Sequence, residues 1–453
     1  MEKHQAQDQN AKTFDDNKLP KAFVAYTKEL FGEERFNKFL SGLGQLSPVS
    51  IRLNPFKLPA NATINEALKP TQIPWCKEGF YLNERPNFTF DPLIHAGAYY
   101  VQEASSMFLA HILRQFVHFP VALLDLCAAP GGKTTCARTA IPSESIVFSN
   151  EPMGKRAQIL AENVQKFGHP DVVVTNNYPI DYKKTKLKFD VIVADVPCSG
   201  EGMFRKDEQA MTEWSEKNVA NCWQLQRSIV ADIWDNLNSG GLLIYSTCTF
   251  NAHENEENIA WILNEYNAEL LEVKTEKDWN IMGSLINNPL KDKDSFPVYR
   301  FIPGFTKGEG LFMAVIKKAG TNPNLAEKHT INGEKLIGEA KKKLYIIAHG
   351  VKAGTTKGKN VVPDHSLALM INGKNDFPKI EINYETAIKY LRREAITLES
   401  NAPKGIVTLT FKGLAIGFAK NLGNRANNLY PQEWRIKSSH LPEEQSIINK
   451  IQI

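Results

Sequence analysis

The sequence lacks the features of a secreted or membrane-spanning chain. Its first twenty residues are polar and of mixed charge, without the apolar core of a signal peptide. None of the later segments offers about 18 uncharged apolar residues in succession, the length that a transmembrane helix needs. We therefore expect a cytoplasmic protein without a membrane span.

Cysteine is also scarce, and its spacing excludes two further classes of protein. The six cysteines form no CxxC pair and lie too far apart for a zinc cluster: Cys76, Cys127, Cys136, Cys198, Cys222 and Cys248. This distribution indicates neither a metal site nor a disulfide framework, and it suits a reducing compartment.

Charge and composition leave the function open. The 453 residues are 42% hydrophobic and 23% charged, as in ordinary soluble globular proteins. The net charge is only +4, which is weak support for a nucleic-acid partner. The length predicts about three domains.

Short apolar runs alternate with helical segments from Val121 onward. The runs read VALLDLC, SIVFSNE, DVVVTN, FDVIVADV and GGLLIYSTCT. Such alternation predicts a parallel sheet with right-handed crossovers, a doubly wound α/β domain. Two later runs, at Leu270 and Gly310, are expected to close one edge as an antiparallel hairpin.

The flanking regions have a different pattern. Apolar spacing over 21–43 predicts one or two amphipathic helices, and the run SIRLNPFK from Ser50 predicts a strand. Residues 1–90 therefore form a small α+β unit in our prediction. The stretch 319–335 lacks apolar periodicity and is predicted to be a linker, followed by a basic segment and short strand-like runs.

A glycine loop, CAAPGGKTT, follows the first strand of the α/β domain directly. Glycines at a strand-to-helix turn allow a ligand to approach the backbone and the helix N-terminus, so this loop predicts a small-molecule site. The loop imitates the P-loop of nucleotide triphosphatases, but that pattern needs a glycine where Cys127 stands. The dinucleotide G-x-G-x-x-G pattern is absent too. Glu151, at the end of the second strand, is the candidate ligand of ribose hydroxyls.

Four motifs together carry a specific resemblance. LDLCAAPGGKTT, SNE, ADVPCSGEGMFRK and YSTCTFNAHENEENIAWIL occur in one order, and with QEASSMF they cover about 52–318. In this combination the chain resembles the Sun-type (NSUN) family of RNA cytosine-5 methyltransferases, and within it the bacterial RsmF-like branch that methylates 16S ribosomal RNA. The resemblance implies a doubly wound Rossmann-like methyltransferase domain with a small N-terminal α+β domain and a C-terminal PUA-like α+β region.

The family implies S-adenosylmethionine as the cofactor. Glu151 would hold its ribose and Asp195 would lie near its methionine part. The family usually has an Asp after the third strand that touches adenine, but here the run reads VTNNYPIDY, so Asn177 or Tyr178 occupies that place. The expected loop contacts are Cys127, Ala128, Ala129, Pro130, Gly131, Gly132 and Lys133.

Two cysteines at predicted strand ends fit the chemistry of this family. Carbon 5 of cytosine takes a methyl group only after a nucleophile has added to carbon 6, and a thiolate suits that step. By resemblance Cys248 is the nucleophile, Cys198 assists release of the product, and Asp195 bonds to the cytosine ring. The DNA enzymes instead use the cysteine of their Pro-Cys dipeptide, so Thr247-Cys248 points to RNA.

Candidate RNA contacts lie in all three parts of the chain. Arg52 belongs to a run that resembles the family's Arg-containing motif, and Lys206 could position the base or its phosphate. The C-terminal region resembles the PUA-like tail of the branch, where Arg425 and Lys437 belong to an expected basic face with Tyr430 and Trp434 beside it.

These observations predict an organisation and a partner. The expected parts are an N-terminal RNA-recognition domain over 1–90, a methyltransferase domain over 91–318, a linker over 319–335, a basic subdomain over 336–385 and a PUA-like RNA-binding domain over 386–453. The expected partner is ribosomal RNA or the small ribosomal subunit, bound by a monomer. A transfer-RNA cytosine-5 methyltransferase and a non-catalytic RNA-binding assembly factor stay as alternatives, although the catalytic motif residues are intact.

Overall fold

The computed structural model describes residues 14, 16–290, 295–327, 329–350, 354–357, 360–371, 376–440, 442–444 and 446–450. Most of the polar arm, and parts of the predicted basic subdomain at 351–353, 358–359 and 372–375, lie outside these ranges. In the described part of the chain, no helix has the length and apolar character needed to cross a bilayer.

A single large sheet organises the middle of the chain. Nine of the described strands belong to it, in the order β11-β13-β10-β9-β6-β7-β8-β14, with β12 paired to β13. Their bounds are β6 Ala122–Asp125, β7 Ile146–Asn150, β8 Val172–Thr175, β9 Phe189–Asp195, β10 Leu237–Thr247, β11 Ala268–Leu271, β12 Tyr299–Phe301, β13 Leu311–Lys318 and β14 Ile346–His349. The strands from β8 through β10 run parallel. The predicted doubly wound domain is confirmed, and so is the antiparallel pairing of β11 with β13.

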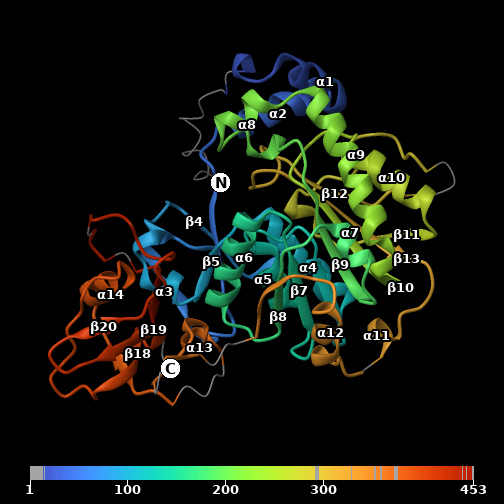
Figure 1. Ribbon diagram of the computed structural model, residues 1–453. Helices are drawn as coiled ribbons and strands as arrows, with labels where there is room; N and C mark the ends of the chain where they lie inside the picture. Colours follow the sequence, from blue (N-terminus) through green and yellow to red (C-terminus); the bar gives the residue numbers. More distant parts are fainter. Residues whose placement is uncertain are drawn as a thin grey trace.

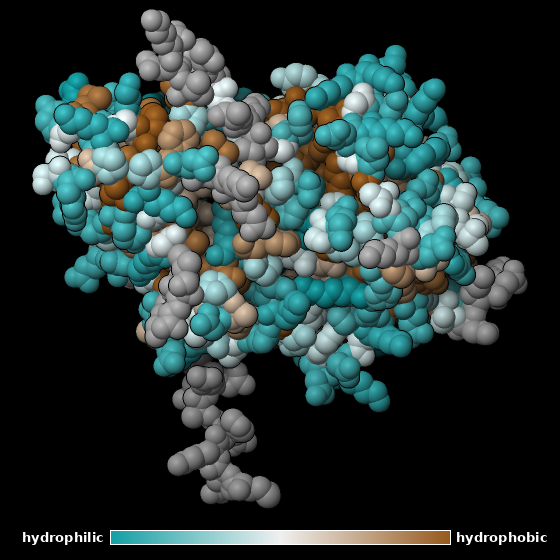
Figure 2. Space-filling model, turned by 90° about the horizontal axis from the view of Figure 1, so that it is seen from below, coloured by the Kyte–Doolittle hydropathy of each residue, from teal (hydrophilic) through white to brown (hydrophobic). Residues whose placement is uncertain are grey.

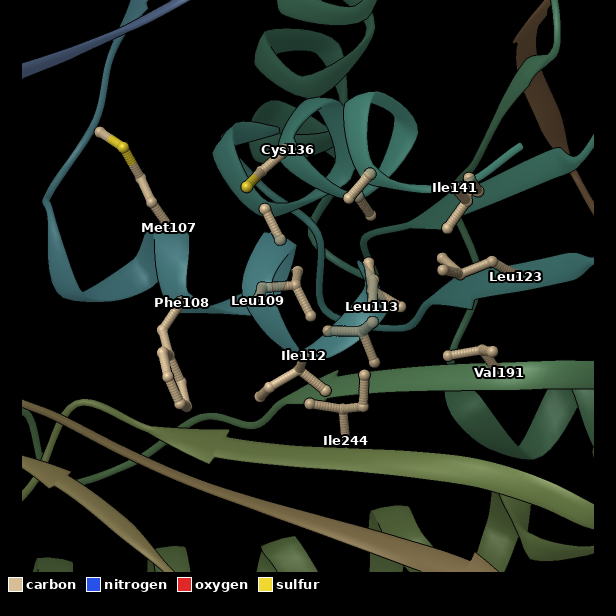
Figure 3. Packing of buried hydrophobic residues seen from close by; sticks show 14 of the residues in the cluster. Met107, Phe108, Leu109, Ile112, Leu113, Leu123, Cys136, Ile141, Val191 and Ile244 are labelled. Atoms are coloured by element: carbon tan, nitrogen blue, oxygen red, sulfur yellow. The ribbon is translucent and has the colours of Figure 1, made fainter. Parts of the chain in front are cut away.

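Helices cover both faces of this sheet because its parallel strands are apolar on both sides. One face carries α4 Phe108–Phe116, α5 Gly132–Ala140 and α6 Gly154–Phe167. Figure 3 shows Ile112 and Leu113 of α4 directed at the sheet. The other face carries α7 Pro179–Lys183, α9 Glu216–Ile233, α10 Glu256–Glu265 and α12 Gly333–Ala340. Burial of each such Ile or Leu contributes about 1.5–3 kcal/mol.

The N-terminal region is divided between two neighbours. Two helices, α1 Lys21–Phe31 and α2 Glu33–Leu43, confirm the predicted amphipathic pair, with a break at Gly32, whose φ is 75°. Their aromatic face packs beside α8 Glu208–Glu213 and α9, where the ring of Phe23 lies 5.0 Å from that of Phe204 (Figure 1). The following sheet has the order β3-β4-β1-β5, with bounds β3 Thr71–Ile73, β4 Cys76–Leu82, β1 Val49–Leu53 and β5 Tyr99–Val101.

The C-terminal region packs against that N-terminal sheet. Its own sheet has the order β17-β18-β19-β20, with bounds β17 Lys379–Glu381, β18 Gly405–Phe411, β19 Leu414–Asn421 and β20 Ala426–Asn428. Leu93 and Tyr99 share one apolar cluster with Tyr390 and Tyr430, and the two regions lie side by side in Figure 1. Tyr430 is 1% exposed, so it is a core residue and does not flank a basic surface as the sequence suggested.

The remaining helices and strands connect these parts. They are β2 Thr63–Ile64, α3 Pro92–His95, α11 Pro323–Ala326, β15 Thr355–Lys357, β16 Asn360–Val362, α13 His365–Leu369, α14 Tyr384–Leu391 and β21 Ile448–Lys450. The last strand pairs with β2, so the end of the chain returns to the N-terminal region. The face drawn in Figure 2 is largely hydrophilic, and hydrophobic residues show on it in separate groups.

Candidate active site

The glycine loop joins β6 to α5 at the carboxyl edge of the sheet. Gly131 has a φ of 112°, a conformation that favours glycine. A Cβ at Gly131 would lie 3.2 Å from a methyl carbon of Leu160, and one at Gly132 would lie 3.3 Å from the ring of Tyr100. Because these glycines lack side chains, a ligand at this edge of the sheet can approach the main chain of the loop and the N-terminus of α5.

An ion pair between Lys133 and Asp195 lies beside this loop. The Nζ atom of Lys133 donates to Oδ2 of Asp195 at 2.8 Å, and the hydroxyl of Ser246 donates to Oδ1 at 2.6 Å. Burial lowers the pKa of Lys133, but attraction to Asp195 outweighs it and the pKa lies above its usual value. The lysine therefore keeps its charge, and the carboxylate is held in one orientation at the end of β9.

The two predicted cysteines meet at the ends of neighbouring strands. Cys198 follows β9, Cys248 follows β10, and their Sγ atoms lie 3.2 Å apart. The hydrogen bond to Cys248, together with burial, raises the pKa of the Cys198 thiol well above its usual value. Cys198 therefore stays a protonated thiol. The loop after it is held close, because the Gly202 amide donates to the Cys248 carbonyl at 2.8 Å and a Cβ at Gly202 would lie 2.7 Å from that oxygen.

Behind the cysteines lies a buried polar network that the sequence reasoning missed. Glu254 accepts from the Ser199 amide at 3.0 Å and from Gln226 at 2.7 Å, which ties the loop of Cys198 to α9. The Asn251 amide donates to Glu254 at 2.8 Å and to Glu201 at 3.0 Å. All four side chains are at most 2% exposed. In the sequence, the run of Asn and Glu residues after Cys248 is the feature that could have predicted this network.

A buried ion pair holds the segment that follows Cys248. The guanidinium of Arg300, on β12, donates to Glu256 at 2.8 Å and to the Phe250 carbonyl at 2.7 Å. Both partners are nearly inaccessible to water. The segment after Cys248 is thus fixed from two sides.

Glu151, the predicted ribose ligand, is buried at the end of β7 with one oxygen free. Its Oε1 accepts from the Met153 amide at 3.0 Å. Its Oε2 lies 3.4 Å from Arg156 but has no hydrogen-bond partner among the described residues. A buried unsatisfied acceptor is costly, and a ribose hydroxyl would satisfy it. The site therefore fits the predicted cofactor at this point.

Asp125, the last residue of β6, is a second buried carboxylate in the crevice. Its Oδ2 accepts from Thr134 at 2.6 Å, while Oδ1 is without a hydrogen-bond partner in the described part of the chain. Burial raises the pKa of Asp125 to about 7. The sequence reasoning passed over it because it looked like part of an apolar strand.

Asn177 follows β8, as predicted, but its amide is already occupied. Its Nδ2 donates to the Tyr345 carbonyl at 3.1 Å, and its Oδ1 accepts from the Tyr345 amide at 3.0 Å. Tyr345 thus uses one N–H and one lone pair of the Asn177 side chain, and the contact of Asn177 with adenine stays a prediction. Tyr178, the other candidate, is 61% exposed.

The four candidate RNA contacts lie in different settings. Arg52 is 1% exposed and donates to Gln102 and Thr135, so it links β1 to α5 and offers no guanidinium to a phosphate. Lys206 is 37% exposed and lies 3.5 Å from Glu309. Arg425 and Lys437 are exposed on the C-terminal region. Among the residues that the structure describes, no group of three or more His, Cys, Asp or Glu side chains could hold a metal ion.

Family models match all three parts of the chain. Residues 119–317 match the 16S rRNA methyltransferase RsmB/F, residues 19–104 match the N-terminal domain of 16S rRNA methyltransferase RsmF, and residues 377–436 match the methyltransferase RsmF PUA domain. The chain is 27% identical to ribosomal RNA small subunit methyltransferase F of Escherichia coli strain K12, over 92% of this chain and 96% of that protein.

Two solved structures share the fold. A methyltransferase homolog from Pyrococcus horikoshii is 26% identical with a TM-score of 0.55, over 66% of this chain and 95% of that one. NSun6 from Pyrococcus horikoshii, determined with the S-adenosylmethionine analogue SFG, has a TM-score of 0.55 at 20% identity, over 68% of this chain and 100% of that one.

Proposed function

Because the chain belongs to the 16S rRNA methyltransferase RsmB/F family, we propose that it methylates carbon 5 of a cytosine in 16S ribosomal RNA through a covalent bond to Cys248. The observation that carries the mechanism is the 3.2 Å contact between the sulfurs of Cys248 and Cys198, beside the Lys133–Asp195 pair. S-adenosylmethionine, when bound by the glycine loop and Glu151, supplies the methyl group.

The first step is the addition of the Cys248 thiolate to carbon 6 of the cytosine. The sulfur–carbon bond forms, the ring double bond opens, and electron density moves toward ring nitrogen 3, which takes up a proton from solvent and gives it back when the neutral product forms. Asp195, fixed by Lys133 and Ser246, accepts a hydrogen bond from the cytosine amino group. The nearby Lys133 ammonium stabilises the negative charge that develops on the ring.

The second step is release. After carbon 5 has taken the methyl group, its proton is lost to a water molecule and the bond between carbon 6 and sulfur breaks. The electron pair returns to Cys248, whose sulfur leaves as a thiolate. Cys198 remains a thiol because its pKa is raised, so it donates a hydrogen bond to the departing sulfur.

Replacement of Cys198 tests this assignment of roles. In Cys198→Ala the addition and the methyl transfer still occur, but release slows and the protein–RNA adduct accumulates as a slower band in denaturing electrophoresis. The double variant Cys198→Ala with Cys248→Ala is the control and should give no band. An adduct with Cys248→Ala and none with Cys198→Ala would exchange the two roles.

The partner and its location form the finer part of the proposal. We infer that a monomer acts in the cytoplasm on ribosomal RNA or the small ribosomal subunit, with the predicted N-terminal 1–90 and PUA-like 386–453 domains gripping the RNA around the catalytic domain. Arg425, Lys437 and Lys206 are at least partly exposed, so they can neutralise phosphates. Replacing Arg425 and Lys437 by Ala should lower the salt dependence of RNA binding by about two counterions.

Bisulfite sequencing separates this proposal from its rivals. Ribosomal and transfer RNA from cells with and without the protein should differ at a cytosine of 16S RNA. A difference confined to transfer RNA would change the substrate, and no difference would favour an assembly factor without catalysis.

A further inference from the structure

The strand β14 brings the segment that follows α12 to the edge of the sheet where the glycine loop lies. The order β6-β7-β8-β14 places the glycine loop, Glu151 and Asn177 in a row along the carboxyl edge, with β14 next in line. Because β14 runs antiparallel to β8, it begins where β8 ends. The residue at that position, directly before β14, is Tyr345.

Three hydrogen bonds fix the main chain of Tyr345 at this edge. Its carbonyl accepts from the Asn176 amide at 3.0 Å and from the Asn177 side chain at 3.1 Å. Its own amide donates to Asn177 at 3.0 Å. Asn177, which stands where the related enzymes have an acid, therefore binds this segment of the chain through both the nitrogen and the oxygen of its side-chain amide.

Large apolar side chains are left exposed around the same edge. Tyr345 is 65% exposed, Tyr178 is 61% exposed and Met153 is 56% exposed. Met153 and Tyr178 each lie three residues past the ends of β7 and β8, and Tyr345 lies directly before β14. The neighbour of Tyr345 in the strand, Ile346, packs into the core, so alternation along the strand directs the Tyr345 ring to the other side. A flat aromatic ligand would cover such a group of side chains.

We propose that Tyr345 is the adenine-binding residue of the cofactor site, and that the segment between α12 and β14 borders the adenine in place of an acid after β8. The inference rests on the proposed function, because it takes S-adenosylmethionine as the ligand. It makes this segment, which lies beyond the predicted linker 319–335, part of the cofactor site.

The affinity for S-adenosylhomocysteine, measured by calorimetry on the full chain, tests this proposal. Loss of a stacking ring weakens binding, so Tyr345→Ala should bind about tenfold more weakly, while Tyr345→Phe keeps the ring and should stay within about twofold of the wild type. Leu422→Ala, which removes another exposed apolar side chain, is the matched control and should bind as the wild type does. Melting temperatures without ligand show whether each variant is folded.

Asn177→Asp distinguishes a role of Tyr345 in adenine binding from that of an acid after β8. A carboxylate cannot donate to the Tyr345 carbonyl, so this variant should release Tyr345 and weaken binding about threefold. Tighter binding by Asn177→Asp would overturn the proposal, because it would show that an acid alone serves adenine.

Photolabelling gives a measurement that needs no variant. An 8-azidoadenosyl analogue of the cofactor should label the peptide that contains Tyr345 in the wild-type chain, and labelling confined to other peptides would overturn the inference. If the wild type does not bind S-adenosylhomocysteine, the proposed function fails as well. If the wild type binds and Tyr345→Ala binds equally well, only this inference fails.

Discussion

The two ends of the crevice are built in different ways. At the sulfur end, Cys198 and Cys248 sit on loops whose buried carboxylates, Glu201 and Glu254, accept hydrogen bonds from main-chain amides and from Asn251. At the proposed adenine end, Met153, Tyr178 and Tyr345 are exposed, and Asn177 is the one side chain that binds the main chain of Tyr345 in the described residues. The sulfur end needs a rigid geometry before any ligand arrives, since covalent chemistry tolerates little misplacement. At the proposed adenine end, the exposed side chains can take their final positions when the ligand binds.

The largest expected effect is on activity at the sulfur end. Cys248→Ala removes the nucleophile, and methylation of 16S RNA should fall by at least about a thousandfold, because no other group forms the carbon 6 bond. Binding of S-adenosylhomocysteine should stay within about twofold, since the glycine loop and Glu151 are untouched. Tritium transfer and calorimetry on the same preparation measure both. Activity within tenfold of the wild type would place the nucleophile elsewhere.

The next effect concerns the network behind the cysteines. Asn251→Ala removes one buried donor from each of the carboxylates Glu201 and Glu254, so we expect the free energy of unfolding to fall by about 4 kcal/mol. The melting temperature of the ligand-free protein measures this loss. If the melting temperature falls no more than it does for a substitution of an exposed residue, the network does not support the site.

The third prediction concerns Asp125 and the pH dependence of the free energy of unfolding. Because burial raises the pKa of Asp125 to about 7, the folded chain keeps a proton there that the unfolded chain has lost above about pH 4. Stability from this group is present at low pH and is lost as pH rises to about 7. Between pH 5 and 8 the free energy of unfolding should fall by about 3 kcal/mol more in the wild type than in the variant Asp125→Asn. Parallel pH profiles of melting temperature for the two proteins would contradict this.

The sequence predicted the sulfur end far better than the adenine end. The cysteines predicted to be catalytic sit within short motifs at the ends of long buried strands, so the local pattern indicates both their type and their place. The adenine end depends on Tyr345, which lies 168 positions from Asn177 and precedes a strand of only four residues. No local pattern signals such a pairing.

Arg52 illustrates the same limit in the N-terminal region. Its run was recognisable, and the strand predicted there exists as β1. Its burial depends on Gln102 and Thr135, which reach it only in the folded chain. An arginine in a motif therefore predicted a phosphate contact, where the fold gives it a role in joining β1 to α5.

The smallest effect on stability is expected for Asn177, whose side-chain amide lies at the proposed adenine end as that of Asn251 lies at the sulfur end. Asn177→Ala removes the same amide group, but its two hydrogen bonds to Tyr345 are only partly buried and leave no charged group unsatisfied. We expect the free energy of unfolding to fall by about 1 kcal/mol, and affinity for S-adenosylhomocysteine to fall by about threefold as Tyr345 loosens. Methyl transfer at saturating cofactor should be unchanged, because the cysteines keep their support. The pair Asn177→Ala and Asn251→Ala, measured side by side for melting temperature and for binding, isolates the difference between the two ends. If both variants lose the same stability and bind the ligand alike, the adenine end is as preorganised as the sulfur end, and the contrast drawn between them is wrong.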